Sequence, residues 1–372
     1  ELVDGTYGLK FVGGQWEFSG ASDAKDIFTR TVSGAALDSN TKIATTTIAW
    51  STEVGRTQKT EIVEKLTHWD SPAEGTCKIG PLTGNWAAPQ VLSSIDIGAG
   101  VSGTDVVVKL PYVYVSGVSS TAAKHDIFIY NVSNPSAPQF SASLDIGSKG
   151  INALFARGNY LYAASPNDGK ELIIFDISTP GSIGEAGYFD LTGSTDAFSV
   201  IAFGASTVAI GRDEAAANEL VFINVANPAS PSIISEVAIG DDVNDFTATN
   251  EKLFLISEDS APDIWVYNIT NPLNPVFVNN HQLGDNDYIS IFLQDKDGAN
   301  LLIGSENENN NQFMTVGATN TAQMYVRDTI VPGGEVNDIV CVESDLAFLA
   351  TTNSGKEFLI MNVLNPDNIT EY

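Results

Sequence analysis

The chain has 372 residues, of which 43% are hydrophobic, so it is long enough for two or three domains and apolar enough to bury a core. The formal net charge is −28, with −3 on residues 1–80 (11 acidic and 8 basic) and −25 on the remainder. Such an acidic surface repels phosphate backbones and anionic lipid headgroups, which disfavours nucleic-acid binding and passive membrane binding. It suits saline or extracellular surroundings.

Residues 1–80 are predicted to form a small antiparallel β domain. Four runs have strand composition and are separated by turn residues: 5–11, 27–32, 43–50 and 60–69. A Val54-Gly55-Arg56 turn predicts that the last two form a hairpin. The Pro- and Gly-containing segment 70–76 is the predicted boundary, so we expect domains at 1–80 and 81–372.

From residue 85 onward one phrase recurs, of the form hydrophobic–Asn/Asp–hydrophobic–x–Asn/Thr–Pro. Its prolines stand at 135, 180, 228, 272 and 366, in steps of 45, 48, 44 and 94. The last step spans two repeats with an eroded copy at 318–321 between them, and a half copy occupies 85–90. Self-similarity at a fixed period of this length is typical of repeat architectures.

Each repeat contains four short apolar runs bounded by Gly, Asn, Asp and Pro, as residues 141–177 illustrate. Four strands in about 45 residues is the composition of one propeller blade. The sequence therefore predicts an all-β fold: a six-bladed β-propeller of four-stranded blades after the N-terminal antiparallel sheet. The irregular fifth unit (about 279–326) leaves five or seven blades open. We expect the strand at 90–98 to join the last blade and close the ring.

The repeats resemble the bacterial LVIVD-repeat family. The resemblance rests on Leu172-Ile173-Ile174-Phe175-Asp176-Ile177-Ser178, on Gly158-Asn159-Tyr160-Leu161-Tyr162, and on the recurrence of both phrases over residues 86–372. It implies a β-propeller module of the cell surface or extracellular space, and it implies no particular activity.

The N-terminal module is similar to the C-terminal sheet of type IV pilin-like proteins. The similarity rests on Phe28-Thr29-Arg30, a Thr-rich strand ending at Trp50, Gly55-Arg56-Thr57 and Leu66-Thr67-His68-Trp69. Proteins of that kind begin with a long hydrophobic helix, and no run of 18 or more apolar residues occurs here. The resemblance implies that Glu1-Leu2-Val3 is a remnant of that helix.

The residues that usually carry catalysis are sparse. His68, His125 and His281 are scattered, without the spacing of a zinc site, and no Gly-x-Ser-x-Gly elbow occurs. Two Gly-Lys-Glu phrases, at 169–171 and 355–357, precede strands instead of helices and are interpreted as hairpin turns, not phosphate loops. Cys341 lies in an apolar run and is predicted to be a buried thiol. A bridge to Cys77 is the alternative.

Two acidic features are candidates for ion binding. The phrase Asp295-Lys296-Asp297-Gly298 could begin a calcium loop, but its glycine stands at the fourth position instead of the sixth, and a hairpin turn explains it. An Asp or Asn also precedes the first long strand of every unit: Asp105, Asn152, Asp196, Asp245, Asp287 and Asp338. These six side chains could ring one mouth of the channel and hold calcium, or each could cap its own turn.

On these grounds the favoured interpretation is a non-catalytic display or adhesion protein of the cell surface or pilus, with no catalytic residues and no cofactor. Its partner would be a protein or glycan bound at a loop face of the propeller, or pilus subunits, and not nucleic acid or membrane. The alternative is a secreted propeller enzyme, a hydrolase or lyase with or without calcium. Its candidate carboxylates are Asp245 and Asp338, flanked by Asn244 and Asn337.

Overall fold

The computed structural model is all-β and divides into two compact units, Glu1–Pro72 and Ala73–Tyr372. It describes residues 5–12, 15–19, 22–25, 28–38, 41–51, 57–67, 89–119, 124–147, 149–214, 218–249, 251–257, 262–284, 286–294, 300–306, 311–342 and 345–372. The predicted domain boundary near residue 80 falls in 68–88, outside these ranges, so it stays a prediction. Within the described ranges no helix is long and apolar enough to cross a bilayer.

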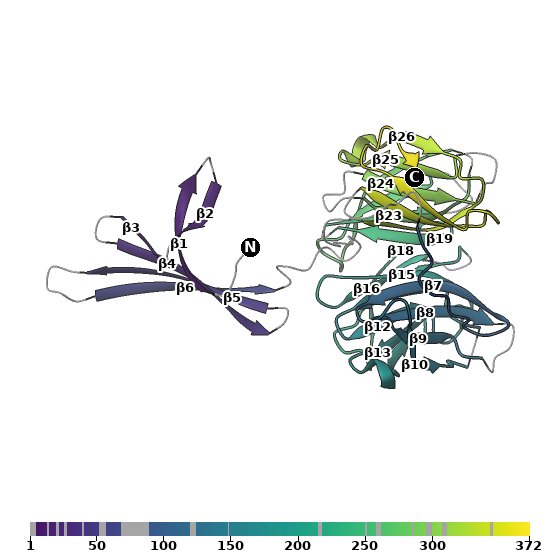
Figure 1. Ribbon diagram of the computed structural model, residues 1–372, viewed down its shortest axis with the longest axis horizontal. Helices are drawn as coiled ribbons and strands as arrows, with labels where there is room; N and C mark the ends of the chain where they lie inside the picture. Colours follow the sequence, from purple (N-terminus) through teal and green to yellow (C-terminus); the bar gives the residue numbers. More distant parts are fainter. Residues whose placement is uncertain are drawn as a thin grey trace. The chain divides into compact units, whose positions relative to one another are not determined.

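The N-terminal unit is one antiparallel sheet with strand order β2-β1-β4-β5-β6, and β3 pairs with β4 (Figure 1). Its strands are β1 (Gly5–Val12), β2 (Gln15–Ser19), β3 (Asp23–Lys25), β4 (Phe28–Asp38), β5 (Thr41–Ser51) and β6 (Thr57–Thr67). The pairing of β4 with β5 is continuous from Thr29–Ala49 to Gly34–Ala44. The pairing of β5 with β6 is continuous from Thr41–Thr67 to Ser51–Thr57. The β5–β6 pair is the predicted hairpin.

The second unit is a propeller of six four-stranded antiparallel sheets, here called blades 1 to 6 in chain order. Blade 1 contains β7 (Val101–Lys109), β8 (Tyr112–Ser119), β9 (Ile127–Asn131) and β10 (Gln139–Leu144). Blade 2 contains β11 (Ala153–Arg157), β12 (Tyr160–Ala164), β13 (Leu172–Asp176) and β14 (Gly184–Phe189). Blade 3 contains β15 (Ala197–Phe203), β16 (Thr207–Arg212), β17 (Leu220–Asn224) and β18 (Ser232–Val237). Blade 4 contains β19 (Val243–Ala248), β20 (Lys252–Ser257), β21 (Ile264–Asn268) and β22 (Val276–His281). Blade 5 contains β23 (Tyr288–Leu293), β24 (Asn300–Ser305), β25 (Phe313–Gly317) and β26 (Tyr325–Ile330). Blade 6 contains β27 (Val336–Val342), β28 (Leu346–Thr351), β29 (Phe358–Asn362) and β30 (Thr370–Glu371).

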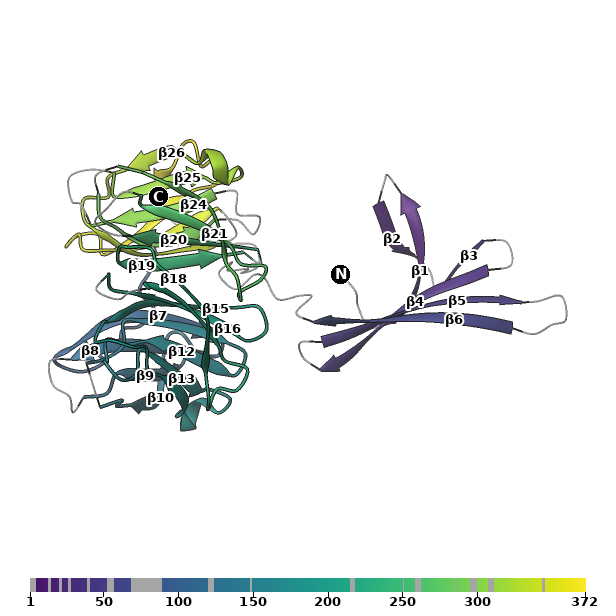
Figure 2. The same ribbon diagram turned by 180° about the vertical axis from the view of Figure 1, so that it is seen from behind.

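The six-bladed prediction is confirmed, and the blades follow one another in chain order, as the colours show from both sides (Figure 1, Figure 2). The first strand of each blade is innermost, because the first strands of successive blades contact one another: β7 with β11, β11 with β15, β15 with β19, β19 with β23, and β23 with β27. Two short 3-10 turns, Pro180–Ser182 and Thr321–Gln323, stand between third and fourth strands.

The core lies between successive blades. Five clusters of buried apolar side chains join blades 1–2, 2–3, 3–4, 4–5 and 5–6, and each pairs the flat faces of two neighbouring sheets. Among the described residues no such cluster joins blade 6 to blade 1.

The recurrent Asn-Pro phrase forms the turn that leads to the outer strand. In five blades the Asn or Asp at the end of the third strand accepts a hydrogen bond from the backbone N–H two residues later, at 2.8–3.1 Å: Asn131, Asp176, Asn224, Asn268 and Asn362. This side-chain bond to the local backbone is the predicted reason for the repeat phrase. The Gly-Lys-Glu phrases form the predicted turns, since Lys170 N and Lys356 N bond back to Asn167 O and Asn353 O, both at 2.8 Å.

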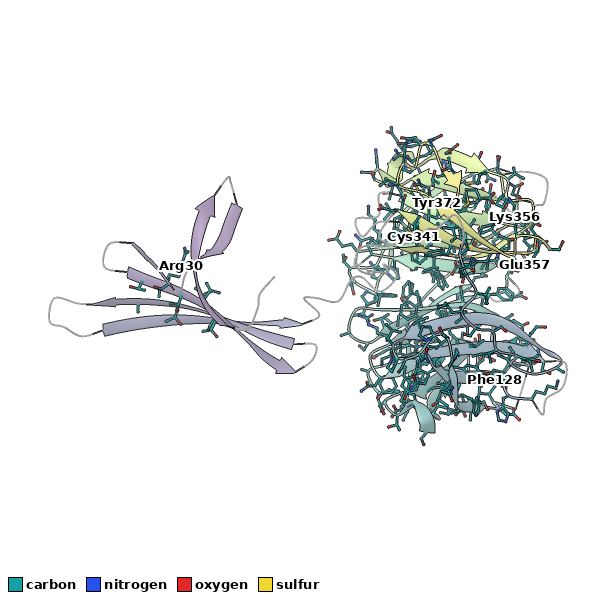
Figure 3. The ribbon with its side chains drawn as sticks, in the orientation of Figure 1. Arg30, Phe128, Cys341, Lys356, Glu357 and Tyr372 are labelled. Atoms are coloured by element: carbon teal, nitrogen blue, oxygen red, sulfur yellow. The ribbon has the colours of Figure 1, made fainter. Side chains whose placement is uncertain are left out.

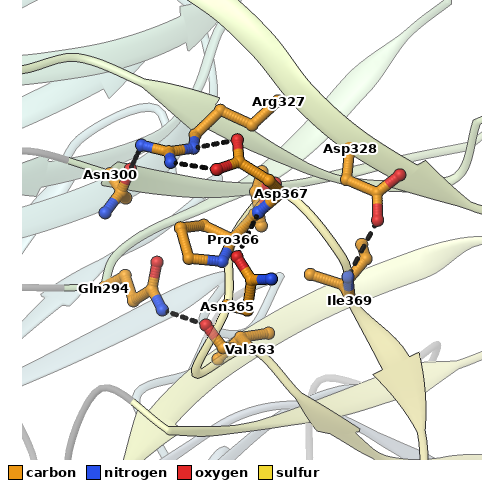
Figure 4. A network of polar contacts seen from close by, with 10 residues as sticks. Gln294, Asn300, Arg327, Asp328, Val363, Asn365, Pro366, Asp367 and Ile369 are labelled. Atoms are coloured by element: carbon orange, nitrogen blue, oxygen red, sulfur yellow. Dashed lines mark hydrogen bonds and ion pairs between the residues drawn. The ribbon is translucent and has the colours of Figure 1, made fainter.

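In the later part of the ring, the turn before the outer strand is also held by the outer strand of the preceding blade. Figure 4 shows this contact between blades 5 and 6: Asp328 Oδ2 accepts from Ile369 N at 2.8 Å. Arg327 binds both carboxylate oxygens of Asp367, at 2.9 and 2.7 Å. Equivalent contacts recur earlier in the ring, where Ser235 Oγ donates to Pro272 O and Asn279 Nδ2 to Thr321 O.

The predicted closing strand differs in this structure. Residues 89–98 form no strand, and the fourth strand of blade 6 is the two-residue β30, which pairs with Met361 and Asn362 of β29. The C-terminal residues occupy the first positions of the edge on which 90–98 was expected to pair, and this overlap accounts for the difference. Cys341 is buried, as predicted, whereas Cys77 lies outside the described residues, so the question of a bridge stays open to prediction.

Candidate functional site

Three acidic residues lie at equivalent positions on inner strands: Asp105 in β7, Asp245 in β19 and Asp338 in β27. At each of them the pairing with the second strand shifts register, between Gly103 and Val106, Val243 and Asp245, and Val336 and Asp338. A β-bulge bends the strand and re-aims the side chain beside it. The three carboxyl groups therefore belong to one level of the inner ring.

Two of the carboxyl groups bridge neighbouring blades. Asp105 Oδ1 accepts from Val106 N at 2.5 Å, and its Oδ2 accepts from Leu154 N of blade 2 at 2.6 Å. Asp245 makes the same pair of bonds, with Phe246 N at 2.7 Å and with Ile291 N of blade 5 at 2.9 Å.

Among the described residues Asp338 bonds only to its own strand, where Oδ1 accepts from Ile339 N at 2.7 Å. It is the most exposed of the three side chains, whereas Asp105 and Asp245 are half-buried. Its second oxygen, Oδ2, has no protein partner in the described part of the chain, so it is accessible to a ligand or to water.

The surroundings raise the pKa of all three acids. Burial, reinforced by the charge of Asp338, raises the pKa of Asp105 to about 7 against the opposing effect of the backbone bonds from Leu154 and Val106. Burial also raises the pKa of Asp245 well above its usual value; the bond from Ile291 opposes this, and the charges of Asp338 and Asp105 reinforce it. Burial raises the pKa of Asp338 as well, but its exposure to water screens the effect.

The six residues expected to form the ring do not lie at one level. Asn152 sits one residue before β11, and its Nδ2 donates to Ala197 O of blade 3 at 2.8 Å. Asp196 and Asp287 both precede their strands, and Asp196 lies 3.7 Å from Lys149. The structure therefore brings together three of the six, because the bulge shifts the register of each inner strand in a way that a spacing count overlooks.

Serines occupy the same level in two other blades, and sequence reasoning missed them. Ser199 Oγ donates to Val243 O at 3.2 Å, and Ser290 Oγ donates to Val336 O at 2.8 Å. A glycine of the second strand, Gly211 or Gly304, pairs with each serine because a Cβ there would collide with the serine hydroxyl. A Ser followed by a Gly some 12–14 residues later was the available signal.

With Ala153 of blade 2, these residues define what we call the channel ring: Asp105, Ala153, Ser199, Asp245, Ser290 and Asp338. The ring combines a carboxyl group that titrates near neutrality with a more accessible carboxylate, which is the arrangement that general acid–base chemistry requires. Among the described residues no three His, Cys, Asp or Glu side chains lie close enough to hold a metal ion together. The phrase 295–298, weighed as a calcium loop, lies outside the described residues, so that alternative stays a prediction.

Comparison with known proteins supports the propeller. The LVIVD repeat family matches residues 152–191, which cover most of blade 2. No curated protein matches the sequence. A provisionally named 6-phosphogluconolactonase from Bacteroides fragilis is similar over 92% of this chain and 93% of its own, with 9% identity and a TM-score of 0.61.

Two further solved structures are similar. A protein from Bacteroides uniformis with the same provisional name matches 70% of this chain and 80% of its own, with 9% identity and a TM-score of 0.58. Sqt1 from Chaetomium thermophilum matches 73% of this chain and 72% of its own, with 14% identity and a TM-score of 0.52. At these identities the similarity establishes the fold.

These comparisons correct the favoured functional interpretation. None of the three similar structures is an adhesion protein, and two carry the name of an enzyme. The prediction of a non-catalytic display or adhesion protein is therefore wrong, and the alternative of a propeller enzyme is better supported. The expectation that the chain is not an enzyme loses its support for the same reason. The chain is a six-bladed β-propeller that contains an LVIVD repeat at residues 152–191.

Proposed function

We propose that the propeller is a hydrolase that uses the channel ring for general acid–base catalysis on an ester or lactone. The observation that carries the proposal is the difference between two interacting acids: Asp105, with a pKa of about 7, and the more accessible Asp338. Carboxyl groups in unlike environments can divide the roles of acid and base between them. The enzyme names of two similar propellers support a lactone as the first substrate class to examine.

In this proposal the Asp338 carboxylate takes a proton from water as the water oxygen attacks the carbonyl carbon. The C–O bond to the leaving oxygen then breaks, and protonated Asp105 supplies the proton to that oxygen. The products are a carboxylic acid and an alcohol, joined in one molecule where the substrate was a lactone. Proton transfer from Asp338 back to Asp105 through water restores the starting state.

The charge of the propeller narrows the substrate class. Residues 81–372 carry −25, and the channel ring contains three carboxyl groups and no basic side chain. A phosphorylated substrate would be repelled by this field. We therefore favour an uncharged or cationic ester or lactone over a phosphorylated one.

A panel of neutral and anionic lactones and esters, followed by acid release in a weakly buffered indicator assay, tests the proposal. We expect hydrolysis of at least one neutral compound, with Asp338→Asn and Asp105→Asn each lowering kcat by about 100-fold or more. Asp287→Asn, an exposed change just before β23, is the matched control and should leave kcat unchanged. Turnover that both channel-ring variants retain would refute the assignment, as would a lack of turnover across the panel.

We also infer that the protein works outside the cytoplasm, with the N-terminal sheet β1–β6 as a pilin-like base. Support comes from the acidic propeller surface and from the motifs of residues 28–69 that resemble pilin-like sheets. Fractionation of the native organism with an antibody against the propeller tests this. Recovery in the cytoplasmic fraction alone would contradict it.

A further inference from the structure

The outer strand of blade 4, β22, exposes more large apolar side chains than the outer strand of any other blade in the described part of the chain. Val276, Phe277 and Val278 follow one another and are 52%, 49% and 40% exposed, and Leu273 in the turn before the strand is 72% exposed. Each of the other outer strands exposes at most two: Phe140, Tyr188, Ile233, Tyr325 and Val326. An apolar run of this kind on a sheet edge marks an interaction surface.

The same strand has no charged residue. From Ile264 to Gly284 the sequence contains no Asp, Glu, Lys or Arg, and the chain has no longer stretch of this kind. Four other outer strands contain charged residues, which discourage pairing with a further strand: Glu185 in β14, Glu236 in β18, Arg327 and Asp328 in β26, and Glu371 in β30. On blade 6, Lys356 binds Glu371 at 2.7 Å and lies beside Glu357 (Figure 3). The edge of blade 4 lacks this protection.

The outer strand of blade 1, β10, also has no charged residue and provides a comparison. Phe140 of β10 and Phe277 of β22 occupy equivalent places, because each packs edge-on against a tyrosine of the third strand. The ring centroids are 5.9 Å apart for Phe140 and Tyr130, and 5.8 Å apart for Phe277 and Tyr267. Phe140 is 61% exposed, but its neighbours in β10 are polar. β22 is therefore the outer strand that combines exposed apolar side chains on both faces with the absence of charge.

The neighbouring blades hold β22 in place from both sides. Ser235 Oγ of blade 3 donates to Pro272 O in the turn before the strand at 2.7 Å, and Asn279 Nδ2 of β22 donates to Thr321 O of blade 5 at 2.6 Å. The inner side of β22 pairs with β21 along its length, whereas no described strand pairs with its outer side. A strand fixed in this way loses little conformational freedom when another strand adds to it, which favours association.

The net charge decides which partner fits this edge. Residues 81–372 carry −25, so a basic partner would bind more strongly to the acidic remainder of the surface than to an uncharged strand. A partner with a high negative charge is repelled by that surface and can approach only where the charge is missing. A second copy of this chain has such a charge and presents the same uncharged strand. Two copies related by a two-fold axis bring identical surfaces together, as antiparallel pairing of one strand with its copy requires.

We propose that the protein forms a two-fold dimer in which β22 pairs antiparallel with β22 of a second copy, so that the two fourth blades share one continuous sheet. The partner strand covers Val276, Phe277 and Val278. A pairing of six residues from each copy buries less than the roughly 1,200 Å² of a standard interface, so we expect a dissociation constant in the micromolar range. The dimer does not involve the channel ring, so this inference is independent of the proposed hydrolase activity.

Sedimentation velocity of the full chain from about 1 µM to about 200 µM tests the dimer. Phe277→Glu and Val278→Glu should each weaken dimerisation by about 10-fold or more, because each brings like charges together across the two-fold axis and removes apolar contact. Val278→Glu leaves the Phe277–Tyr267 contact intact, so it stays informative if Phe277→Glu disturbs the fold.

Phe140→Glu is the matched control, because it changes the net charge equally and replaces the equivalent exposed ring of blade 1. It should leave the dissociation constant within about twofold of the wild type. A protein that is monomeric at every concentration would overturn the proposal. So would a dimer that both β22 variants retain, or an equal loss in the control.

The salt dependence separates this dimer from one held by opposite charges. Raising NaCl from about 0.1 M to about 1 M shortens the Debye length from about 10 Å to about 3 Å and screens the repulsion between the two acidic copies. The dissociation constant should therefore fall by about threefold or more. A dimer that weakens at high salt would contradict the proposal, because opposite charges would then hold it together.

Hydrogen exchange locates the contact within the chain. The backbone N–H groups of Val276–His281 should exchange more slowly at about 200 µM than at about 1 µM, because pairing with the partner strand protects them. Those of Gln139–Leu144 in β10 should exchange at the same rate at both concentrations. Protection of β10 instead of β22, or of neither strand, would refute the assignment. None of these measurements depends on catalytic turnover, so a failure of the hydrolase proposal would leave them interpretable.

Discussion

The raised pKa of Asp105 makes a specific prediction about stability and pH. The value rises from 3.8 to about 7 in the folded protein, mainly because the carboxyl group is buried. Between these two values the folded protein holds the proton while the unfolded chain releases it, so stability falls as the pH rises through this window. The difference in pKa is equivalent to about 4 kcal/mol, present in full at pH 3 and lost by about pH 8.

Asp105→Asn removes this dependence and adds a constant loss. In asparagine one of the two carboxyl oxygens is replaced by an NH2 group, which cannot accept a hydrogen bond. Either Val106 N or Leu154 N therefore loses its partner, at a penalty of about 1–3 kcal/mol. At pH 4 the variant should therefore be less stable than the wild type. At pH 8 it should equal or exceed the wild type, because the wild type has lost the contribution of its proton.

Scanning calorimetry of the propeller transition from pH 4 to pH 8 measures the effect. The difference in melting temperature between variant and wild type should change by about 8 °C across this range, toward the variant at high pH. Asp287→Asn, at an exposed residue outside the channel ring, should follow the wild-type curve at every pH. Parallel curves for Asp105→Asn and the wild type would refute the assignment of a buried, protonated carboxyl group.

Two further substitutions test a contact between two blades and a buried bond within one blade. Gly187→Ala should destabilise the propeller by about 3 kcal/mol, because the added Cβ would collide with Pro228 O of blade 3. Gly169→Ala is the control: the space around its Cβ is open, so it should change the free energy of unfolding by less than about 0.5 kcal/mol. Urea denaturation measures both. Glu219→Ala should lower the free energy of unfolding by about 2–5 kcal/mol, because the backbone N–H groups of two residues lose their acceptor. A loss no larger than that of Gly169→Ala would show that these two bonds contribute little.

The repeat phrase made the blade count predictable from sequence. An Asn or Asp that bonds its own turn and a proline that ends the strand are local requirements, so they recur wherever the turn recurs. The irregular fifth unit keeps its turn through a different residue, Asn320, whose side chain accepts from Ala322 N. Hydrogen bonds of this kind involve only neighbouring residues, so the turn can be predicted from the sequence without knowing how the blades pack.

The channel ring was only partly predictable, because its composition depends on register. A bulge shifts which side chain faces inward by one residue, and neither spacing nor hydrophobicity locates the bulge. Asp105, Asp245 and Asp338 were named for the right strands, whereas Asp196 and Asp287 stand outside theirs. Ser199 and Ser290 were missed because serines at the start of a strand are common in any repeat.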